Sequence, residues 1–208
     1  AMSIRVKICG ITNSEDALKA VYYGAWAIGF IFTKKSPRYV SPSKARKIVE
    51  SLPPFITPVG VFVDLSERAV RDICKFTKIT TIQLHGDETP GYCRRLKDMK
   101  VIKAFRIGES YPADLINSYT VDAYLFDTYD DKISGGTGKA FNWEILKGQK
   151  IEKPFILSGG LSPENVQKAI EAVNPYALDV SSGVEKSPGI KDAHKMRNFF
   201  GAADFKIS

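Results

Sequence analysis

The sequence lacks the long apolar segments of membrane and secreted proteins. None of its 208 residues belongs to an apolar run near the roughly 20 residues that a membrane-spanning helix needs. The start, Ala1-Met2-Ser3-Ile4, has no apolar segment of the length of a secretion signal. We therefore expect a cytoplasmic protein with no membrane partner. Ala1 precedes Met2 and is interpreted as an addition to the natural start, so the expected domain covers residues 2–208.

Cysteine is also scarce. The three cysteines, Cys9, Cys74 and Cys93, are odd in number and do not have the spacing of a zinc site. This pattern argues against a disulfide framework and favours free thiols in a reducing compartment. Cys74 and Cys93 fall in segments predicted to be neighbouring helices, where a bridge is conceivable but uncommon inside cells. No metal ligand set is expected.

A concentrated basic block is missing as well. The formal net charge of +7 would suit a protein that binds nucleic acid through phosphate contacts. The lysines and arginines are instead spread among acidic residues, without interleaved aromatic side chains. We therefore expect no nucleic-acid partner, and a basic surface that attracts a small anionic substrate explains the charge equally well.

Strand-like and helix-like segments alternate along the whole chain. Strands are expected at residues 4–8, 26–32, 58–63, 80–84, 101–105, 123–126, 155–157 and 177–180. Helices are expected at residues 13–23, 41–52, 66–75, 89–96, 111–118, 142–146, 162–173 and 192–200. The strands are apolar throughout and the units recur about every 25 residues, which is typical of a closed parallel (β/α)8 TIM barrel.

An open doubly wound sheet is the alternative fold. Its glycine fingerprint normally follows the first strand, whereas the glycines here cluster after the sixth, seventh and eighth strands. The chain also has no obvious linker or low-complexity tract. Its length and its 44% hydrophobic content suit one sizeable core, so we expect a single barrel domain of the α/β class.

The carboxyl ends of the strands in such a barrel meet at one face and form the active site. The candidates at these ends are Cys9, Arg38, Asp64, His85, Arg106, Asp127, residues 158–160 and residues 181–183. Lys7 lies two residues before Cys9 and shares its face of the strand, so its charge favours the thiolate, which is basic and nucleophilic. A lone cysteine is nevertheless more often an inert core residue.

Two glycine loops follow the seventh and eighth strands. They are Ser158-Gly159-Gly160 and Ser181-Ser182-Gly183. Barrels commonly bind a phosphate between these two loops, where glycine lets backbone amides approach the anion closely. One such loop alone would indicate only a tight turn, but two in these positions favour phosphate binding.

The other polar candidates each have a structural alternative. Arg38 can hold a carboxylate through two hydrogen bonds, although most single arginines in loops are merely solvated. Asp127 is a candidate general acid or an acceptor for its own loop, and His85 is a candidate acid, base or donor or a structural histidine. Lys7 and Asp179 fall on strands that meet where the barrel closes, so we expect an inward ion pair or a direct role.

Eight segments, taken together, resemble one enzyme family over nearly the whole chain. They are Lys7-Ile8-Cys9-Gly10-Ile11-Thr12, Gly29-Phe30 with Ser36-Pro37-Arg38-Tyr39-Val40, Gly60-Val61-Phe62-Val63, Gln83-Leu84-His85-Gly86, Phe126-Asp127-Thr128, Gly135-Gly136-Thr137-Gly138-Lys139, Leu157-Ser158-Gly159-Gly160-Leu161 and Asp179-Val180-Ser181-Ser182-Gly183-Val184-Glu185. In this order they resemble the phosphoribosylanthranilate isomerases of tryptophan biosynthesis.

The resemblance implies an Amadori rearrangement of N-(5-phosphoribosyl)anthranilate, an aminoaldose, to the aminoketose 1-(2-carboxyphenylamino)-1-deoxyribulose 5-phosphate. It implies Cys9 as general base, Asp127 as general acid and Arg38 as the ligand of the substrate carboxylate. The loops with Gly160 and Gly183 would bind the phosphate, and no metal or organic cofactor is expected.

Several points stay open at this stage. The residues Lys7, His85, Gly136 and Asp179 are further candidates for the substrate pocket. Another phosphate-binding barrel enzyme that acts on a related phosphosugar is the alternative function. The expected assembly is a monomer or a homodimer.

Overall fold

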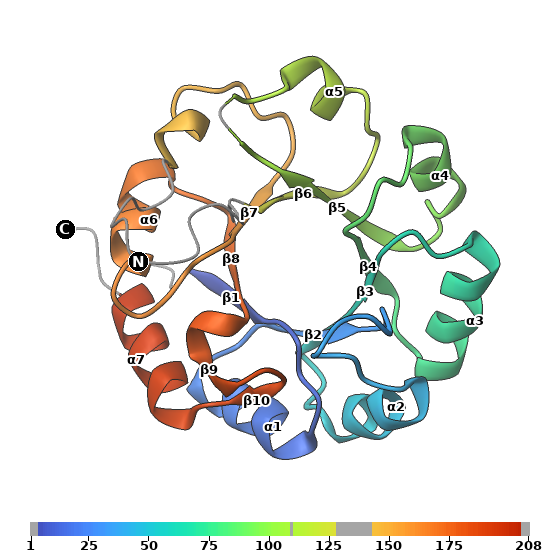
Figure 1. Ribbon diagram of the computed structural model, residues 1–208, viewed down its shortest axis with the longest axis vertical. Coiled ribbons are helices and arrows are strands. Elements are labelled where there is room, and N and C mark those ends of the chain that lie inside the picture. Colours follow the sequence, from blue (N-terminus) through green and yellow to red (C-terminus); the bar gives the residue numbers. More distant parts are fainter. Residues whose placement is uncertain (1–3, 109, 128–142, 205–208) are drawn as a thin grey trace.

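Eight parallel strands form a closed barrel in the computed structural model, which describes residues 4–108, 110–127 and 143–204. Each strand is hydrogen-bonded to the next along the chain, and β8 pairs with β1 (Figure 1). The strands are β1 Arg5–Ile8, β2 Ala27–Ile31, β3 Thr57–Phe62, β4 Thr81–Leu84, β5 Lys100–Arg106, β6 Ala123–Asp127, β7 Phe155–Ser158 and β8 Ala177–Val180. The predicted (β/α)8 barrel is confirmed.

Helices surround the barrel on its outside (Figure 1). They are α1 Ser14–Tyr23, α2 Pro42–Ser51, α3 Glu67–Thr77, α4 Pro90–Arg95, α5 Ala113–Asn117, α6 Val166–Val173 and α7 Ala193–Ala203, with short 3-10 helices η2 Trp143–Leu146 and η3 Ser182–Val184. Among the described residues, no helix has the length and apolar character needed to cross a membrane.

Local sequence signals explain where several helices begin and end. Asn13 caps α1 because its side chain accepts a hydrogen bond from the Asp16 backbone N–H, and Gly24 ends the helix in the left-handed conformation. Ser41 caps α2 in the same way, and Pro42 occupies its first position, where no backbone donor is required. These caps set where the loops from one strand end and where the return to the next strand begins.

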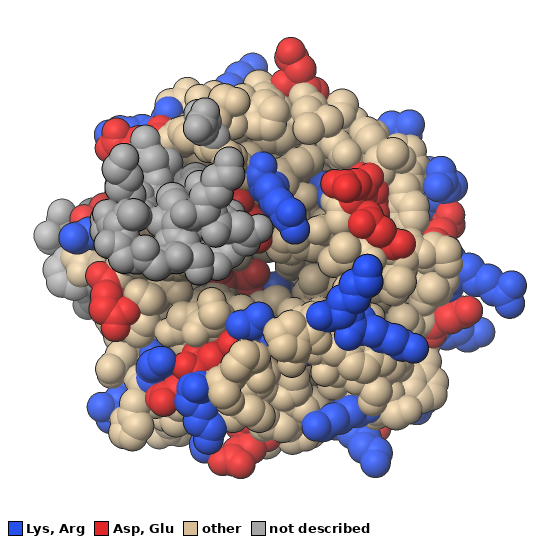
Figure 2. Space-filling view, in the orientation of Figure 1, with Lys and Arg blue, Asp and Glu red and all other residues tan. Residues whose placement is uncertain are grey.

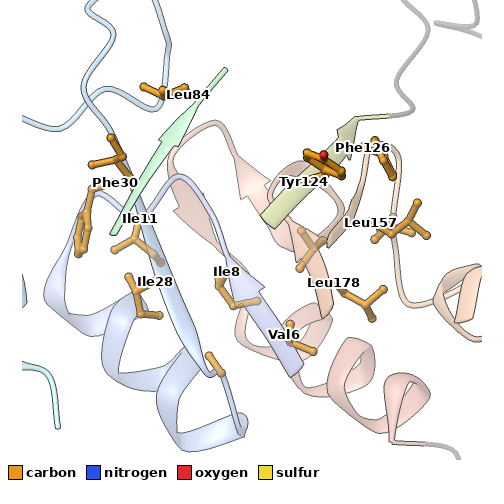
Figure 3. Packing of buried hydrophobic residues seen from close by; sticks show 14 of the residues in the cluster. Val6, Ile8, Ile11, Ile28, Phe30, Leu84, Tyr124, Phe126, Leu157 and Leu178 are labelled. Atoms are coloured by element: carbon orange, nitrogen blue, oxygen red, sulfur yellow. The ribbon is translucent and has the colours of Figure 1, made fainter. Parts of the chain in front are cut away.

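Alternate side chains of the strands belong to two different apolar clusters. The larger cluster includes Val6, Ile8 and Leu178 together with helix residues such as Ala17 and Met196, so it lies between strands and helices. Figure 3 shows part of this cluster, with Val6 and Ile8 on β1 near Leu178 on β8. The smaller cluster lies in the barrel interior and consists of Val59, Ile102, Ala104, Leu125, Ile156 and Ala177.

The structure differs from the sequence prediction in the later part of the chain. The helix expected at 142–146 is the 3-10 helix Trp143–Leu146, and residue 142 lies outside the described residues. The helix expected from Ser162 begins at Val166, because the Ser162 N–H donates to the Asn165 side chain in a preceding turn. The segment after β8 contains η3.

An antiparallel pair, β9 Glu185–Ser187 and β10 Ile190–Lys191, was not predicted. Gly189 allows the turn between these strands through its φ of 80°. The backbone N–H of Lys191 donates to the Asp16 carboxylate at 2.8 Å, which fixes the pair to α1. This pair brings Glu185 and Lys191 back towards the strand ends.

Candidate active site

Cys9 follows β1 directly and is buried, with 5% of its surface exposed. Its backbone N–H donates to the Val180 carbonyl oxygen at 2.9 Å, so the thiol lies at the junction of β1 and β8. Gly29 on β2 provides the space beside it, since a Cβ atom at that position would lie 2.8 Å from the Cys9 Sγ atom. The Cys9 thiol therefore lies between the end of β1 and Gly29 of β2.

Three polar residues occupy the barrel interior next to Cys9. The Nζ atom of Lys7 donates to Oδ1 of Asp179 and to Oε1 of Gln83, both at 2.8 Å. Each of the three is flanked on its strand by residues of the outer apolar cluster, so its own side chain faces the barrel axis. The predicted inward ion pair of Lys7 and Asp179 is confirmed, and Gln83 is an additional partner.

The protonation of Cys9 depends on its burial as well as on Lys7. Burial raises the pKa of the Cys9 thiol, and the positive charge of Lys7 opposes this shift without overcoming it. Burial alone would lower the pKa of Lys7, but the charges and hydrogen bonds of Asp179 and Cys9 together outweigh burial, and the pKa lies above its usual value. Lys7 is therefore a permanent ammonium, while the resting thiol is protonated. Lys7 favours the thiolate, as expected, but the burial of the thiol has the larger effect on its pKa.

Asp127 and His85 form a second group at the carboxyl ends of β6 and β4. The distance between Nε2 of His85 and Oδ2 of Asp127 is 3.1 Å. Nδ1 of His85 lies 2.9 Å from Nε2 of Gln83, which connects this group to Lys7. A hydrogen-bonded series thus runs from the β1 end of the site to the carboxyl group at its opposite side.

Arg38 extends from the loop after β2 towards the same face. Its Nε atom donates to both carboxylate oxygens of Glu185, at 2.9 and 3.1 Å, and its Nη2 atom donates to Oε2 at 2.7 Å. Gly10 leaves room for this side chain, because a Cβ atom there would lie 2.7 Å from Cδ of Arg38. Glu185 also accepts from Nζ of Lys191 at 2.9 Å. Nη1 of Arg38 makes no hydrogen bond with a described residue, so the Nη1–Nη2 edge is available to a ligand.

The two glycine loops line one pocket of about 360 Å³. Its walls are Arg38, Asp127, Ser158, Gly159, Gly160, Leu161, Asp179, Val180, Ser181 and Ser182. Figure 2 shows this view of the molecule hollowed near its centre, with basic and acidic side chains around the hollow. The pocket therefore combines a cation, a carboxyl group and two loops with accessible backbone.

The glycines of these loops have different structural roles. Gly160 has a φ of 63°, and no atom of the described residues lies within 4 Å of the position of a Cβ, so it makes an open, left-handed turn. Gly183 is packed so closely that a Cβ would collide with the carbonyl oxygen of Leu161. Gly183 therefore keeps the two loops together, while Gly160 lines the pocket.

A second pocket of about 450 Å³ lies beside the first, at the ends of β3 to β5. Its lining includes the remaining candidates Asp64, His85 and Arg106. His85 faces this pocket and bonds to Asp127, which lines the first one. The pair of His85 and Asp127 thus separates the two pockets.

Comparison with known proteins gives the family of the chain. The family model described as N-(5'-phosphoribosyl)anthranilate (PRA) isomerase matches residues 6–202. The chain belongs to this family. The N-(5'-phosphoribosyl)anthranilate isomerase of Geobacter metallireducens is 50% identical over 200 residues, which cover 96% of this chain and 98% of the relative.

Solved structures of this family have the same fold. The phosphoribosyl anthranilate isomerase of Thermotoga maritima superposes with a TM-score of 0.87 at 44% identity, covering 96% of this chain and 98% of that one. A second structure of a phosphoribosyl anthranilate isomerase is a complex with reduced 1-(o-carboxyphenylamino)-1-deoxyribulose 5-phosphate. Its TM-score is 0.83 at 42% identity, with the same coverage of the two chains.

The structure of this phosphoribosylanthranilate isomerase family member also places residues that the sequence did not single out. Gln83, Glu185 and Lys191 contact the expected site residues directly. The two-residue spacing of Gln83 and His85 was a usable signal, because it puts both side chains on one face of a strand. The contact of Glu185 with Arg38 depends on the unpredicted β9 and β10. Gly136 lies outside the described residues.

Proposed function

We propose that the chain catalyses the Amadori rearrangement of N-(5'-phosphoribosyl)anthranilate to 1-(2-carboxyphenylamino)-1-deoxyribulose 5-phosphate in tryptophan biosynthesis. The supporting observation is the pocket in which Asp127, Arg38 and both glycine loops converge, next to the backbone contact of Cys9 with Val180. These groups match the carboxylate, the ring oxygen and the phosphate of that substrate. Family membership supports this reaction over one on another phosphosugar.

Asp127 acts as the general acid in this proposal. The ribose ring opens when its oxygen gains a proton, and the electrons of the nitrogen at C1 then form a Schiff base. A carboxyl group at the edge of the pocket is suited to donate this proton, provided that it is in its acid form. Asp127 is a carboxylate after the transfer.

Cys9 acts as the general base. The protonated Schiff base acidifies the C2–H bond, and removal of this proton by the thiolate gives an enolamine, which becomes the ketone when C1 gains a proton and the C2 hydroxyl group loses one. The ammonium of Lys7 stabilises the thiolate relative to an unpaired buried sulfur. Because burial still raises the pKa of Cys9, the reactive form is a minor species of the resting enzyme.

Arg38 and the glycine loops hold the two ends of the substrate in this proposal. Glu185 occupies the Nε–Nη2 edge of the guanidinium, and the Nη1–Nη2 edge is left to bind the anthranilate carboxylate in parallel. Backbone amides near Gly160, and near Gly159, Ser182 and Gly183, bind the phosphate. Binding at both ends positions C2 and the ring oxygen between base and acid.

The decisive experiment is an activity assay with the unstable substrate generated in the reaction mixture. Wild type should convert the aminoaldose to the aminoketose, detected by chromatography of the product. Cys9→Ser and Asp127→Asn should each lower kcat by roughly 100- to 10,000-fold or more with little change in KM. Cys74→Ser changes another buried thiol, on α3, and should retain wild-type rates. A folded wild-type protein without turnover would contradict the proposal.

The assembly is proposed to be a homodimer. Phe55, in the loop between α2 and β3, is 95% exposed and follows Pro53 and Pro54, so an apolar side chain projects from the surface. Sedimentation analysis of wild type and Phe55→Asp measures this, with the variant expected to shift towards the monomer. A cytoplasmic location and a single domain of residues 2–208 are part of the same proposal.

A further inference from the structure

Gln83 is a fully buried amide between two groups of the proposed site. None of its surface is exposed, and it has one polar neighbour on each side. Its Oε1 atom lies 2.8 Å from Nζ of Lys7, and its Nε2 atom lies 2.9 Å from Nδ1 of His85. Two directional contacts on a buried side chain indicate a specific orientation and not only packing.

The orientation of this amide follows from its partners. The ammonium of Lys7 can only donate, so the amide atom facing it must be the carbonyl oxygen. The NH2 group of Gln83 therefore faces His85. The pairing of Lys7 with Asp179 keeps the ammonium charged and in place, so this assignment does not depend on the histidine.

The amide in turn selects one tautomer of His85. An NH2 group is a donor, so Nδ1 of the imidazole must be an unprotonated acceptor. The proton of the neutral ring is then on Nε2, which lies 3.1 Å from Oδ2 of Asp127. A proton on Nδ1 would make this nitrogen a donor that faces the NH2 group of Gln83, which is also a donor. His85 is thus a fixed donor towards Asp127.

We propose that Gln83 is a positioning residue, which fixes His85 as an Nε2–H donor and so directs the acidic proton of Asp127 to Oδ1. Because Oδ2 receives the His85 hydrogen bond, a protonated Asp127 has to carry its proton on the other oxygen. This inference builds on the proposed function, in which Asp127 protonates the substrate. It adds which carboxyl oxygen reacts and which residues determine that choice.

The proton balance of the acid step is simple. The O–H bond at Oδ1 breaks, an O–H bond forms at the ring oxygen, and the ring C–O bond breaks. The resulting carboxylate of Asp127 accepts the unchanged Nε2–H of His85, which stabilises it. Gln83 transfers no proton, because an amide donates and accepts without changing its protonation state at neutral pH.

Nitrogen NMR of the wild-type protein tests the tautomer without any assay. Protonated and unprotonated imidazole nitrogens have widely separated chemical shifts, and the chain has only 2 histidines. His194 is exposed on α7 and serves as the internal reference, identified with a His194→Gln variant. His85 should show a protonated Nε2 and an unprotonated Nδ1. A protonated Nδ1, or averaged signals for both nitrogens, would overturn the proposal.

Gln83→Glu tests the consequence for catalysis. The new carboxylate accepts from both Lys7 and His85, so it should move the His85 proton to Nδ1 and leave Nε2 facing Asp127 as an acceptor. The proton of Asp127 then moves to Oδ2, away from its reactive position. We expect kcat to fall by about tenfold or more while KM changes by less than about threefold, since substrate contacts are untouched.

The matched control is Gln167→Glu, which makes the same chemical change on the exposed face of α6. It should leave kcat, KM and the His85 spectrum as in wild type. A folded Gln83→Glu protein with an Nδ1–H signal but wild-type kcat would overturn the catalytic role of the tautomer. If Gln83→Glu does not fold, the wild-type spectrum decides. Absence of isomerase activity in wild type would instead refute the proposed function, and the spectrum would still decide the tautomer.

Discussion

The Nζ atom of Lys7 lies 2.8 Å from Oδ1 of Asp179, across the seam where β1 and β8 close the barrel. Both side chains are almost fully buried, with 4% and 6% of their surfaces exposed. A buried pair of this kind does not by itself add stability, because the desolvation of two charges opposes their attraction. Loss of one partner, however, leaves the other charge buried without compensation.

Lys7→Met should therefore destabilise the protein by about 3–5 kcal/mol, measured by denaturant unfolding. The double variant Lys7→Met/Asp179→Leu removes both charges and should recover part of this loss. Lys19→Met, which breaks an exposed pair with Glu15, should leave stability nearly unchanged. A double variant less stable than Lys7→Met would contradict this view of the seam.

The pH dependence of kcat/KM should reflect the buried state of Cys9. The active form needs Cys9 ionised and Asp127 protonated. Because burial raises the pKa of Cys9 above its usual value of 9.0, the thiol is the last of the two groups to ionise. The active form holds one proton on the two groups together, so it is lost when the second proton leaves at the higher pKa. Activity should thus decline at high pH as Cys9 ionises, although the role of Cys9 as a base would by itself suggest that its ionisation causes the rising limb of the pH profile. Direct titration of the thiolate absorbance in wild type and Cys9→Ser would check this, and a thiol that ionises below pH 9.0 would contradict it.

The contact between Arg38 and Glu185 should affect substrate binding more than turnover. Arg38→Lys keeps the charge but loses the planar fork, so KM should rise, and Glu185→Gln should also raise KM because Arg38 loses its charged anchor. Glu171→Gln, an exposed change on α6, is the control. Steady-state kinetics measure all three. Wild-type KM in Arg38→Lys with a large increase in Arg38→Ala would show that only the charge matters.

Glu185 should also make stability depend on acidity. Burial alone would raise its pKa, but the hydrogen bonds from Arg38 and the charge of Lys191 outweigh burial and hold the pKa of Glu185 below its usual 4.5. A lowered folded-state pKa gives stability that is fully present above the unfolded-state pKa and is lost as the pH falls through the folded pKa. Below about pH 4.5, the unfolding free energy of wild type should thus fall more steeply than that of Glu185→Gln. Parallel curves would contradict this contribution.

The glycine loops should respond differently to substitution. Gly160→Asp places a negative charge in the proposed phosphate site, and no atom of the described part of the chain lies near the added side chain, so KM should rise strongly while the fold survives. Gly160→Asn has nearly the same shape without the charge and tolerates the left-handed backbone, so its KM should stay much closer to wild type. Gly183→Ala should instead lower the melting temperature, because its Cβ has no space beside Leu161. Equal KM values for the Asp and Asn variants of Gly160 would contradict phosphate binding there.

The barrel was predictable from sequence because its strands are apolar and regularly spaced. Val6, Ile8 and Leu178 belong to the outer cluster, and the residues next to them on their strands face the interior. This alternation along a strand can be read from the sequence. The antiparallel pair after β8 was not recognised, since its strands are only three and two residues long. Pro188-Gly189 was its available turn signal.

The sequence predicted which residues lie at the strand ends, but it predicted few of the contacts between their side chains. Parallel strands bring their carboxyl ends together, so the strand order places Cys9 and Asp127 at one face, while their roles were implied only by the family resemblance. The bond of Arg38 to Glu185 joins residues 147 positions apart and depends on a turn that carries little sequence signal. The pKa of Cys9 is raised because the thiol is buried, and the depth of burial cannot be read from the neighbouring Lys7 in the sequence.

The closure of the barrel through β1 and β8 has a further consequence for how the site comes into existence. Cys9 is delivered by the first strand and anchored by Val180 at the end of the last one, so the two ends of the sequence have to meet before the proposed base is in place. In a growing or partly refolded chain that has paired only β2 to β7, Cys9 is not yet held by Val180. Recovery of catalysis during refolding would therefore mark the joining of the chain's ends, and a spectroscopic signal of helix formation would precede it.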